Sequence, residues 1–170
     1  DSPLDVLAVA FASDYIGAAI QSKFLASLAM KLALAQMLVE PGKKEANLAR
    51  AEAWIARGAT TGAEVVVLPE ALTLGWTHPS ARTLADEIPG GESCLRLREA
   101  ARRNRVAVCS GIIERSGERL FNSAVIIDAA GEVVAMHRKI NELDFGRELY
   151  SLGDRLGICE LAGERVGLMI

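Results

Sequence analysis

Two residues of opposite charge each close an apolar run of the sequence. Glu70 ends the run EVVVLPE at residues 64–70, and Lys139 ends EVVAMHRK at residues 132–139. In open α/β sheets, ligands bind just beyond the carboxyl ends of the strands. A partly desolvated carboxylate there is expected to have a raised pKa and to act as a general base, and a lysine there can stabilise an oxyanion or orient the carboxylate. The alternative for each residue is an ordinary solvated charge at a strand end.

A nucleophile is less apparent than this acid–base pair. Cys94 falls at the start of a predicted helix, where a helix N-terminus can lower the pKa of a thiol. Cys109 and Cys159 lie inside apolar strand runs and are expected to be buried, inert thiols. The sequence has no Gly-x-Ser-x-Gly elbow, P-loop or Gly-x-Gly-x-x-Gly loop, and its two histidines, His78 and His137, lack metal-ligand spacing. We therefore expect no metal site.

The elements that must position these residues follow from hydrophobic periodicity and from glycine and proline breaks. Helices are predicted at residues 43–58 and 93–104, where apolar residues recur at helical spacing. Strands are predicted at residues 31–37, 64–70, 105–114, 120–128, 132–139, 156–161 and 165–170. This order, two strand–helix units followed by hairpins, predicts a mixed α/β sheet with helices on one face. Residues 71–91, rich in glycine and proline, are predicted to be a loop.

Composition restricts the class of protein. The 170 residues carry 19 Lys and Arg against 22 Asp and Glu, a mild acidity that argues against a nucleic-acid partner. Three cysteines without close pairing indicate a reducing, cytoplasmic compartment. Residues 1–29 are apolar, but Asp5, Asp14 and Lys23 interrupt them, so neither a membrane span nor a secretory signal is expected. We predict an amphipathic helix or an extension foreign to the main fold there, with Met30 as a plausible native start.

Several short motifs occur in a fixed order from residue 31 onward. They are EVVVLPE with a loop reaching Gly75 and Trp76, SGIIER, LFNSAVIID-x-x-GEVV, HRKI, YSLGD and RVGLMI. In this order and at these separations, the chain resembles the nitrilase superfamily of carbon–nitrogen hydrolases. The resemblance covers residues 31–170, so we expect residues 1–30 to be an amino-terminal extension and residues 31–170 to be the amino-terminal part of the hydrolase domain.

The resemblance implies a fold and a set of catalytic residues. The family has a four-layer αββα sandwich, which is expected to be incomplete in this chain, and acts through a Glu-Lys-Cys triad with a second glutamate. By the motif match, Glu70 corresponds to the general base and Lys139 to the lysine. Glu148 fits the second glutamate, and Glu142 is the competing candidate. In the loop 71–82, Trp76 is expected to form an apolar wall for the substrate and His78 a polar contact, with loop packing as the alternative for both.

The implied activity is hydrolysis of a small amide, nitrile or N-carbamoyl compound, without a cofactor, by a protein that forms homo-oligomers. The family's nucleophilic cysteine directly follows a strand of the type RVGLMI. That position is the residue after Ile170, so we expect residues 1–170 to lack the nucleophile and to be inactive. The alternative function is a non-catalytic binding or assembly module with the same fold.

Overall fold

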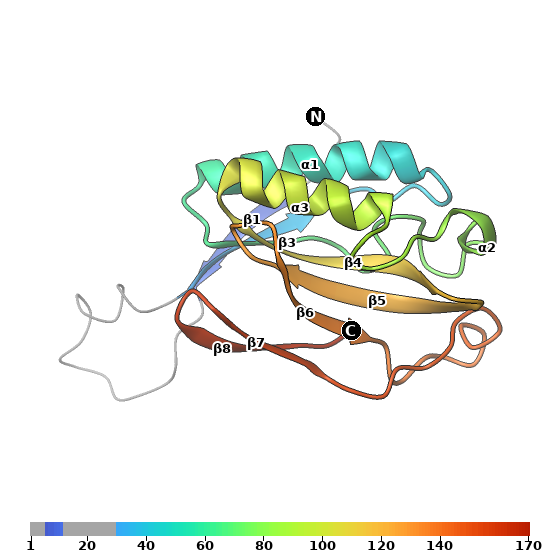
Figure 1. The fold of residues 1–170 in the computed structure, drawn as a ribbon. Coiled ribbons are helices and arrows are strands. Elements are labelled where there is room, and N and C mark those ends of the chain that lie inside the picture. The colour runs from blue at the N-terminus through green and yellow to red at the C-terminus, as the bar shows by residue number, and fades with distance from the viewer. Residues whose placement is uncertain (1–5, 12–29) are drawn as a thin grey trace.

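Helices and a β-hairpin lie on opposite faces of a mixed sheet in the computed structural model, which describes residues 6–11 and 30–170 (Figure 1). The helices are α1 (Lys44–Thr60), α2 (Ala81–Leu84) and α3 (Glu92–Asn104). The strands are β1 (Val6–Phe11), β2 (Lys31–Gln36), β3 (Val65–Val67), β4 (Ala107–Ser116), β5 (Arg119–Ile127), β6 (Val133–Arg138), β7 (Gly157–Leu161) and β8 (Glu164–Leu168). The predicted α/β class is thereby confirmed.

Strands β1 to β6 form one sheet in sequence order, and β7 and β8 form a separate antiparallel pair. The central strands β2, β3 and β4 run parallel, which requires the crossover helices α1 and α3 between them. Strands β4, β5 and β6 are joined by tight antiparallel turns. Gly117, with φ +61°, forms the first of these turns.

The amino-terminal segment differs from its prediction where it is described. Val6–Phe11 form β1, which pairs antiparallel with β2 and extends the sheet, in place of an amphipathic helix. The alternation of branched and small apolar residues in VLAVAF suits a strand, and the open edge of β2 supplies the hydrogen-bonding partner that a sequence pattern does not reveal. The rest of the predicted extension lies outside the described residues.

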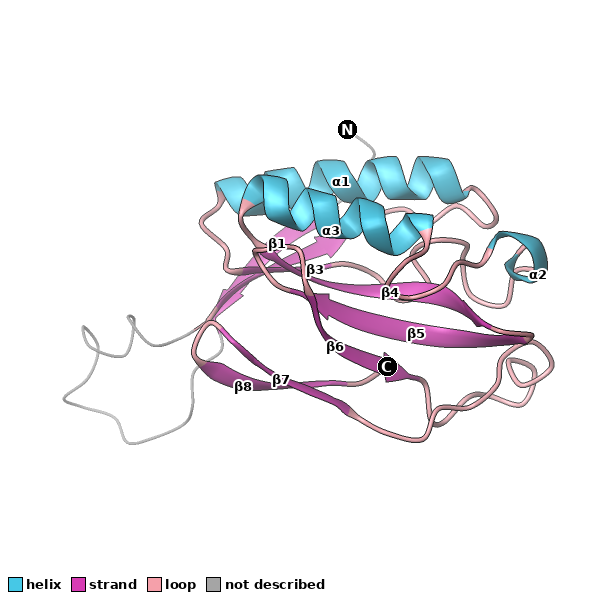
Figure 2. Cartoon of the chain, viewed as in Figure 1, coloured by secondary structure: helices cyan, strands magenta, loops and turns pink. Residues whose placement is uncertain are grey.

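The two long helices cover one face of the sheet (Figure 2). The apolar stripe of α1 includes Leu48, Ala51 and Ile55, which are fully buried against the sheet. Leu97, Ala100 and Ala101 of α3 pack into the same cluster. Burial on one side and charge on the other explains why both helices form close to their predicted bounds.

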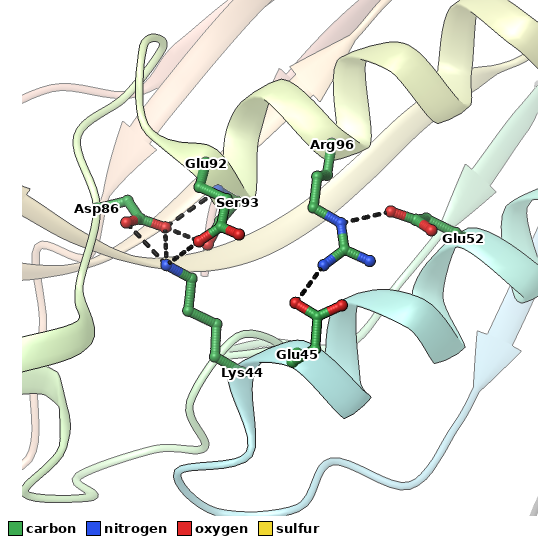
Figure 3. A network of polar contacts seen from close by, with 7 residues as sticks. All are labelled: Lys44, Glu45, Glu52, Asp86, Glu92, Ser93 and Arg96. Carbon is green, nitrogen blue, oxygen red and sulfur yellow. Dashed lines mark hydrogen bonds and ion pairs between the residues drawn. The ribbon is translucent and has the colours of Figure 1, made fainter.

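Ion pairs link α1 to α3 and to the segment before α3 (Figure 3). Lys44, at the start of α1, contacts Asp86 and Glu92 at 2.8 Å each. Asp86 also accepts hydrogen bonds from the backbone and side chain of Ser93 in the first turn of α3. One turn further along, a single guanidinium bridges two carboxylates of α1 through the contacts Arg96–Glu45 and Arg96–Glu52. We call the group Lys44, Asp86, Glu92 and Ser93 the interhelix cluster.

The opposite face of the sheet is covered by two different structures. The β7–β8 hairpin buries Leu161 and Leu168 against Val65, Ala124 and Ile126. The loops that follow β3 and β6 form a second apolar cluster beside it, which comprises Ala71, Leu74, Ala81, Ala85, Ile113, Leu120 and Tyr150. None of the helices in the described part of the chain is long and apolar enough to cross a membrane.

Candidate active site

Glu70 lies beyond the end of β3, because this strand ends three residues earlier than the predicted strand 64–70. The strand ends at Val67, although the Leu68 amide still donates to the Cys109 carbonyl at 2.8 Å. Pro69 has no amide hydrogen, so the ladder cannot continue beyond it. The next two residues then pass over β4 at Gly111, where an added Cβ would lie 2.6 Å from Glu70 Cα and from Ala71 N. Only glycine admits this close approach, which moves Glu70 toward β5 and β6.

Lys139 follows β6 directly and is anchored on both sides. Its amide donates to the Asn122 carbonyl of β5 at 2.8 Å, and its own carbonyl accepts from the Gly153 amide at 2.9 Å. The preceding residue, Arg138, donates two hydrogen bonds to Glu114, whose side chain is 2% exposed, and lies 4.0 Å from the centre of the Phe121 ring. The end of β6, and with it the Lys139 side chain, is therefore held firmly in the sheet.

The structure brings Glu70 and Lys139 together, although their strands are separated by β4 and β5. Lys139 Nζ donates to Glu70 Oε1 at 2.8 Å. The same oxygen accepts a 2.6 Å hydrogen bond from Asn122 Nδ2, and Asn122 is 1% exposed. Glu70 remains 43% exposed, and Lys139 is 17% exposed. The pair is thus held by a residue of the sheet, and Glu70 remains accessible to solvent.

The direction of the Glu70 pKa shift is opposite to the sequence-based prediction. Partial burial raises the pKa, as expected, because it disfavours the charged carboxylate. The hydrogen bonds from Lys139 and Asn122, together with the Lys139 charge, outweigh that effect and hold the pKa below its ordinary value. The prediction considered burial alone, whereas the folded chain supplies two donors. Glu70 is therefore ionised at neutral pH, as a proton acceptor must be.

The structure places Glu142, and not Glu148, beside Lys139. Glu142 Oε1 lies 3.9 Å from Lys139 Nζ, and the Glu142 side chain is 1% exposed. Glu148 is exposed, and within the described residues no hydrogen bond or ion pair joins it to Glu70 or Lys139. The cause is the turn after Glu142, where an added Cβ at Gly146 would lie 2.7 Å from Glu142 Cδ. The chain wraps around Glu142 and directs Glu148 to solvent, so the geometry favours the competing candidate.

Trp76 lies at the site, whereas His78 is held elsewhere. The Trp76 ring centre is 5.8 Å from Lys139 Nζ and 4.8 Å from the Phe145 ring, in an edge-to-face arrangement. This position fits the predicted apolar wall. His78 Nδ1 instead bonds Ser80 Oγ at 2.8 Å, and its ring packs against Gly42. Its contacts match the alternative that was stated for it, packing within the loop.

Tyr150 joins the two loops that frame the site. Its hydroxyl accepts a 3.1 Å hydrogen bond from the Thr77 amide, and its side chain is buried. Burial raises the pKa of Tyr150 to about 12, against the effect of the Thr77 hydrogen bond and with added repulsion from Glu142 and Glu70. The hydroxyl is therefore neutral at pH 7 and fixes the loop 71–80 to the loop 141–150.

The three cysteines lie away from this pair. Cys94 is fully buried in α3, and burial raises its pKa to about 11, contrary to the lowering considered for a helix start. Cys109 and Cys159 are half-buried between the sheet and the hairpin. Burial, with repulsion from Cys159, raises the pKa of Cys109 to about 11, and burial also raises that of Cys159. All three thiols are protonated at neutral pH, and none contacts Glu70 or Lys139.

Two contributors to the site, Asn122 and Tyr150, were missed from the sequence. Asn122 interrupts the apolar run of a predicted central strand, and a polar side chain that faces a buried surface is itself a signal. Tyr150 begins the motif YSLGD, but nothing in the sequence indicates its partner. Among residues 6–11 and 30–170, no group of three or more His, Cys, Asp or Glu side chains is arranged to hold a metal ion.

The chemistry available is that of a base beside a cation. Glu70 Oε2 accepts no hydrogen bond from the described residues, so it is free to take a proton. Lys139 has donors beyond the one used by Glu70 and lies beside the carboxylates of Glu70 and Glu142. A positive group next to a free carboxylate oxygen suits a reaction that removes a proton and develops negative charge nearby.

Comparison with known proteins places the chain in a family. A family model described as carbon-nitrogen hydrolase matches residues 31–170. The chain belongs to the carbon–nitrogen hydrolase family. The resemblance carried by the ordered motifs is thus confirmed.

Curated relatives of this carbon–nitrogen hydrolase chain include nitrilases and amidases. It is 34% identical over 149 residues to a nitrilase of Pyrococcus abyssi, which covers 83% of this chain and 55% of the relative. It is 32% identical over 150 residues to an omega-amidase of Xenopus tropicalis, with 82% and 54% covered. The chain spans about half the length of the curated relatives it matches.

Solved structures show the same fold. A variant of the Nesterenkonia AN1 amidase from the nitrilase superfamily has a TM-score of 0.74 and 22% identity, and the match covers 82% of this chain and 55% of the amidase. A carbon–nitrogen hydrolase superfamily protein of Xanthomonas campestris has a TM-score of 0.71 and 21% identity, with 80% and 51% covered. The hydrolase fold predicted from the resemblance is therefore confirmed for the part described.

Proposed function

We propose that the protein hydrolyses a carbon–nitrogen bond of a small amide, nitrile or N-carbamoyl compound. The observation that carries the proposal is the 2.8 Å contact between Glu70 and Lys139, two residues 69 positions apart. Each comes from a motif of the family resemblance, and the relatives include an omega-amidase and a nitrilase. Trp76 supplies an apolar wall beside the charged pair.

In this mechanism Glu70 is the general base and Lys139 stabilises negative charge. A cysteine thiol has an ordinary pKa near 8.5 and needs a base to become a good nucleophile at neutral pH. Glu70 Oε2 takes the thiol proton, and the thiolate attacks the amide, nitrile or carbamoyl carbon. Lys139 donates to the atom that gains negative charge. With an amide or carbamoyl substrate, Glu70 passes its proton to the leaving nitrogen and then activates the water that releases the acid. With a nitrile, the nitrogen takes the proton but leaves only after water has added.

Glu142 is the better candidate for the second glutamate. Its Oε1 lies near Lys139, while its Oε2 is buried and has no hydrogen-bond partner within the described residues. A buried carboxylate oxygen without a donor is costly, so a substrate N–H is a suitable partner for it. Glu148 has no such position.

The direction of β8 supports a nucleophile at the position that the resemblance gives. Leu168 pairs with Gly157, whose added Cβ would lie 2.9 Å from the Met136 carbonyl of β6. β8 therefore runs back toward the end of β6, where Lys139 lies, and the family's cysteine follows this strand. In a structure of the Nesterenkonia amidase, acrylamide has added to an active-site cysteine. We propose the same type of nucleophile after β8, and not Cys94, Cys109 or Cys159.

The test is an assay of the protein as its gene encodes it. Release of ammonia is measured from short-chain amides, nitriles and N-carbamoyl compounds, with and without a thiol-alkylating reagent. We expect turnover that is lost on alkylation and lost in Glu70→Gln. A protein that binds these compounds but does not convert any of them would instead be the non-catalytic module.

Two further properties belong to the proposal. The resemblance implies a homo-oligomer, which light scattering of the purified protein measures directly. The three cysteines are all free of disulfide bonds, which supports a reducing compartment such as the cytoplasm.

A further inference from the structure

The two oxygens of the Glu70 carboxylate have different surroundings. Oε1 accepts hydrogen bonds from Lys139 Nζ at 2.8 Å and from Asn122 Nδ2 at 2.6 Å. Oε2 receives no donor from the part of the chain that the structure describes, and the side chain is 43% exposed. One oxygen is therefore held in place, and the other is open.

Asn122 is the more deeply buried of the two donors. It lies within β5, is 1% exposed, and accepts the Lys139 amide through its own carbonyl at 2.8 Å. Lys139 has a long side chain and, in the proposed reaction, must also serve the developing charge on the substrate. Asn122 has no second role in the proposed reaction. Its place within β5 leaves its side chain little conformational freedom.

The side-chain amide of Asn122 has one unfavourable feature, a buried oxygen without a hydrogen-bond partner in the described part of the chain. Its Oδ1 is buried without a hydrogen-bond partner among the described residues. Rotating the amide by half a turn would set Oδ1 against the Glu70 carboxylate, two acceptors facing each other. An apolar side chain of similar size would avoid the unpaired oxygen altogether. The hydrogen bond from Nδ2 to Glu70 is therefore the interaction that favours an asparagine at this position.

We propose that Asn122 is a positioning residue that, with Lys139, holds Oε1 of Glu70 so that Oε2 alone takes and returns the proton. The inference rests on the proposed function for the step it serves. In that step the S–H bond of the nucleophile breaks, its electron pair stays on sulfur, and the proton goes to Oε2. The same proton then goes to the substrate nitrogen, which departs directly when the substrate is an amide, so Glu70 ends the half-reaction ionised, as it began.

The first test measures Glu70 itself and needs no turnover. In the protein as its gene encodes it, glutamate carboxyl carbons are labelled with ¹³C, and the Glu70 signal is assigned by its loss in Glu70→Gln. We expect the pKa of Glu70 to rise in Asn122→Ala, since one donor to the charged form is removed. The matched control is Asn104→Ala at the end of α3, whose amide bonds Ala100 O and which leaves the Glu70 pKa unchanged.

A measurement on the unaltered protein tests the proposal even if the Asn122→Ala variant does not fold. The two Nδ2 protons of Asn122 are followed by NMR as pH falls, and we expect their resonances to move with the titration of Glu70. Resonances that stay fixed through that titration, or an unchanged Glu70 pKa in a folded Asn122→Ala protein, would overturn the proposal.

The second test separates positioning from packing by kinetics. We expect Asn122→Ala to lower kcat by roughly tenfold with little change in KM, and to move the acid limb of the rate–pH profile upward. A merely structural residue would lower the amount of folded enzyme and leave the pH profile where it was. Absence of hydrolysis by the unaltered protein contradicts the proposed function, whereas hydrolysis with an unmoved Glu70 pKa contradicts only the role of Asn122.

Discussion

Two clusters in this molecule share one design, a lysine between two carboxylates. In the interhelix cluster, Lys44 contacts Asp86 and Glu92 at 2.8 Å each. In the site, Lys139 contacts Glu70 at 2.8 Å and lies 3.9 Å from Glu142. The lysines are similarly shielded, with 15% and 17% of their side chains exposed. Burial of the lysine therefore does not separate them, although the second carboxylate lies farther from Lys139 than from Lys44.

The acceptors do separate them. Both oxygens of Asp86 are used, one by Lys44 and the other by Lys44 and Ser93 together (Figure 3). At the site, Oε2 of Glu70 is open, and within the described residues the buried Glu142 Oε2 has no partner. A carboxylate whose two oxygens are both hydrogen-bonded, such as Asp86, contributes stability, whereas one with an open oxygen, such as Glu70, can still accept a proton or a ligand.

The largest effect is expected from removing each lysine in turn. Lys139→Met should lower kcat by about a thousandfold or more, because the developing negative charge loses its donor, with a small change in Tm. Lys44→Met should leave kcat unchanged and lower Tm, since Asp86 is then left without its cation. Steady-state kinetics and thermal melts of both variants, made in the protein as its gene encodes it, check this. Equal losses of kcat in the two variants would erase the distinction between the clusters.

The second effect concerns the close approach that places Glu70. Gly111→Ala adds a Cβ where Glu70 Cα and Ala71 N lie 2.6 Å away, so the backbone must shift. A displacement of about 1 Å at a catalytic group costs roughly a hundredfold in rate, which is the loss of kcat we expect. Gly90→Ala is the matched control, because nothing lies within 4 Å of its added Cβ. A Gly111→Ala enzyme with full kcat would show that the crossing over β4 does not set the position of Glu70.

The contrast also shows what sequence could and could not predict. The convergence of Glu70 and Lys139 followed from their places at strand ends, and the helix bounds followed from apolar periodicity. The residues that contact Glu70 and Lys139 could not be predicted in this way. Asn122 lies two strands further along the chain than Glu70, and the choice between Glu142 and Glu148 depends on a turn that no periodic pattern describes.

Two other expectations were wrong because they depended on contacts between segments that are distant in the sequence. The pKa of Glu70 was predicted to rise from burial, but the hydrogen bonds that lower it come from β5 and from the end of β6. Residues 6–11 were not expected to join the sheet, since their pairing depends on the open edge of β2. Local pattern thus identified the elements and the charged pair, and contacts between distant segments decided the rest.

The third effect is on stability and its pH dependence. Burial raises the pKa of Asp86, but the hydrogen bonds from Lys44 and Ser93 and the Lys44 charge outweigh it and lower the pKa below 3.8, its ordinary value. A lowered folded pKa means that this stabilisation is complete above the unfolded pKa and is lost as pH falls through the folded pKa. Asp86→Asn should therefore reduce the free energy of unfolding by about 2 kcal/mol at neutral pH.

Chemical denaturation from pH 7 downward measures this difference, which should shrink at the acid end of the range. The control is Asp154→Asn, because Asp154 and its partner Arg155 are both more than 80% exposed, at 81% and 83%. Such a pair contributes little, so its removal should leave stability unchanged. A pH-independent loss in Asp86→Asn would mean that the charge of Asp86 is not what stabilises the interhelix cluster.

The smallest effect distinguishes the two glutamates of one loop. Glu142→Gln keeps the shape of a side chain that is 1% exposed but removes the charge beside Lys139 and replaces one acceptor with a donor. We expect kcat/KM to fall about tenfold, since the unpaired Oε2 is the acceptor proposed for a substrate N–H. Glu148→Gln, in the same loop and exposed to solvent, should stay within about twofold of the unaltered enzyme. The reverse order of effects would return the role to Glu148 and would mean that the turn around Gly146 opens when substrate binds.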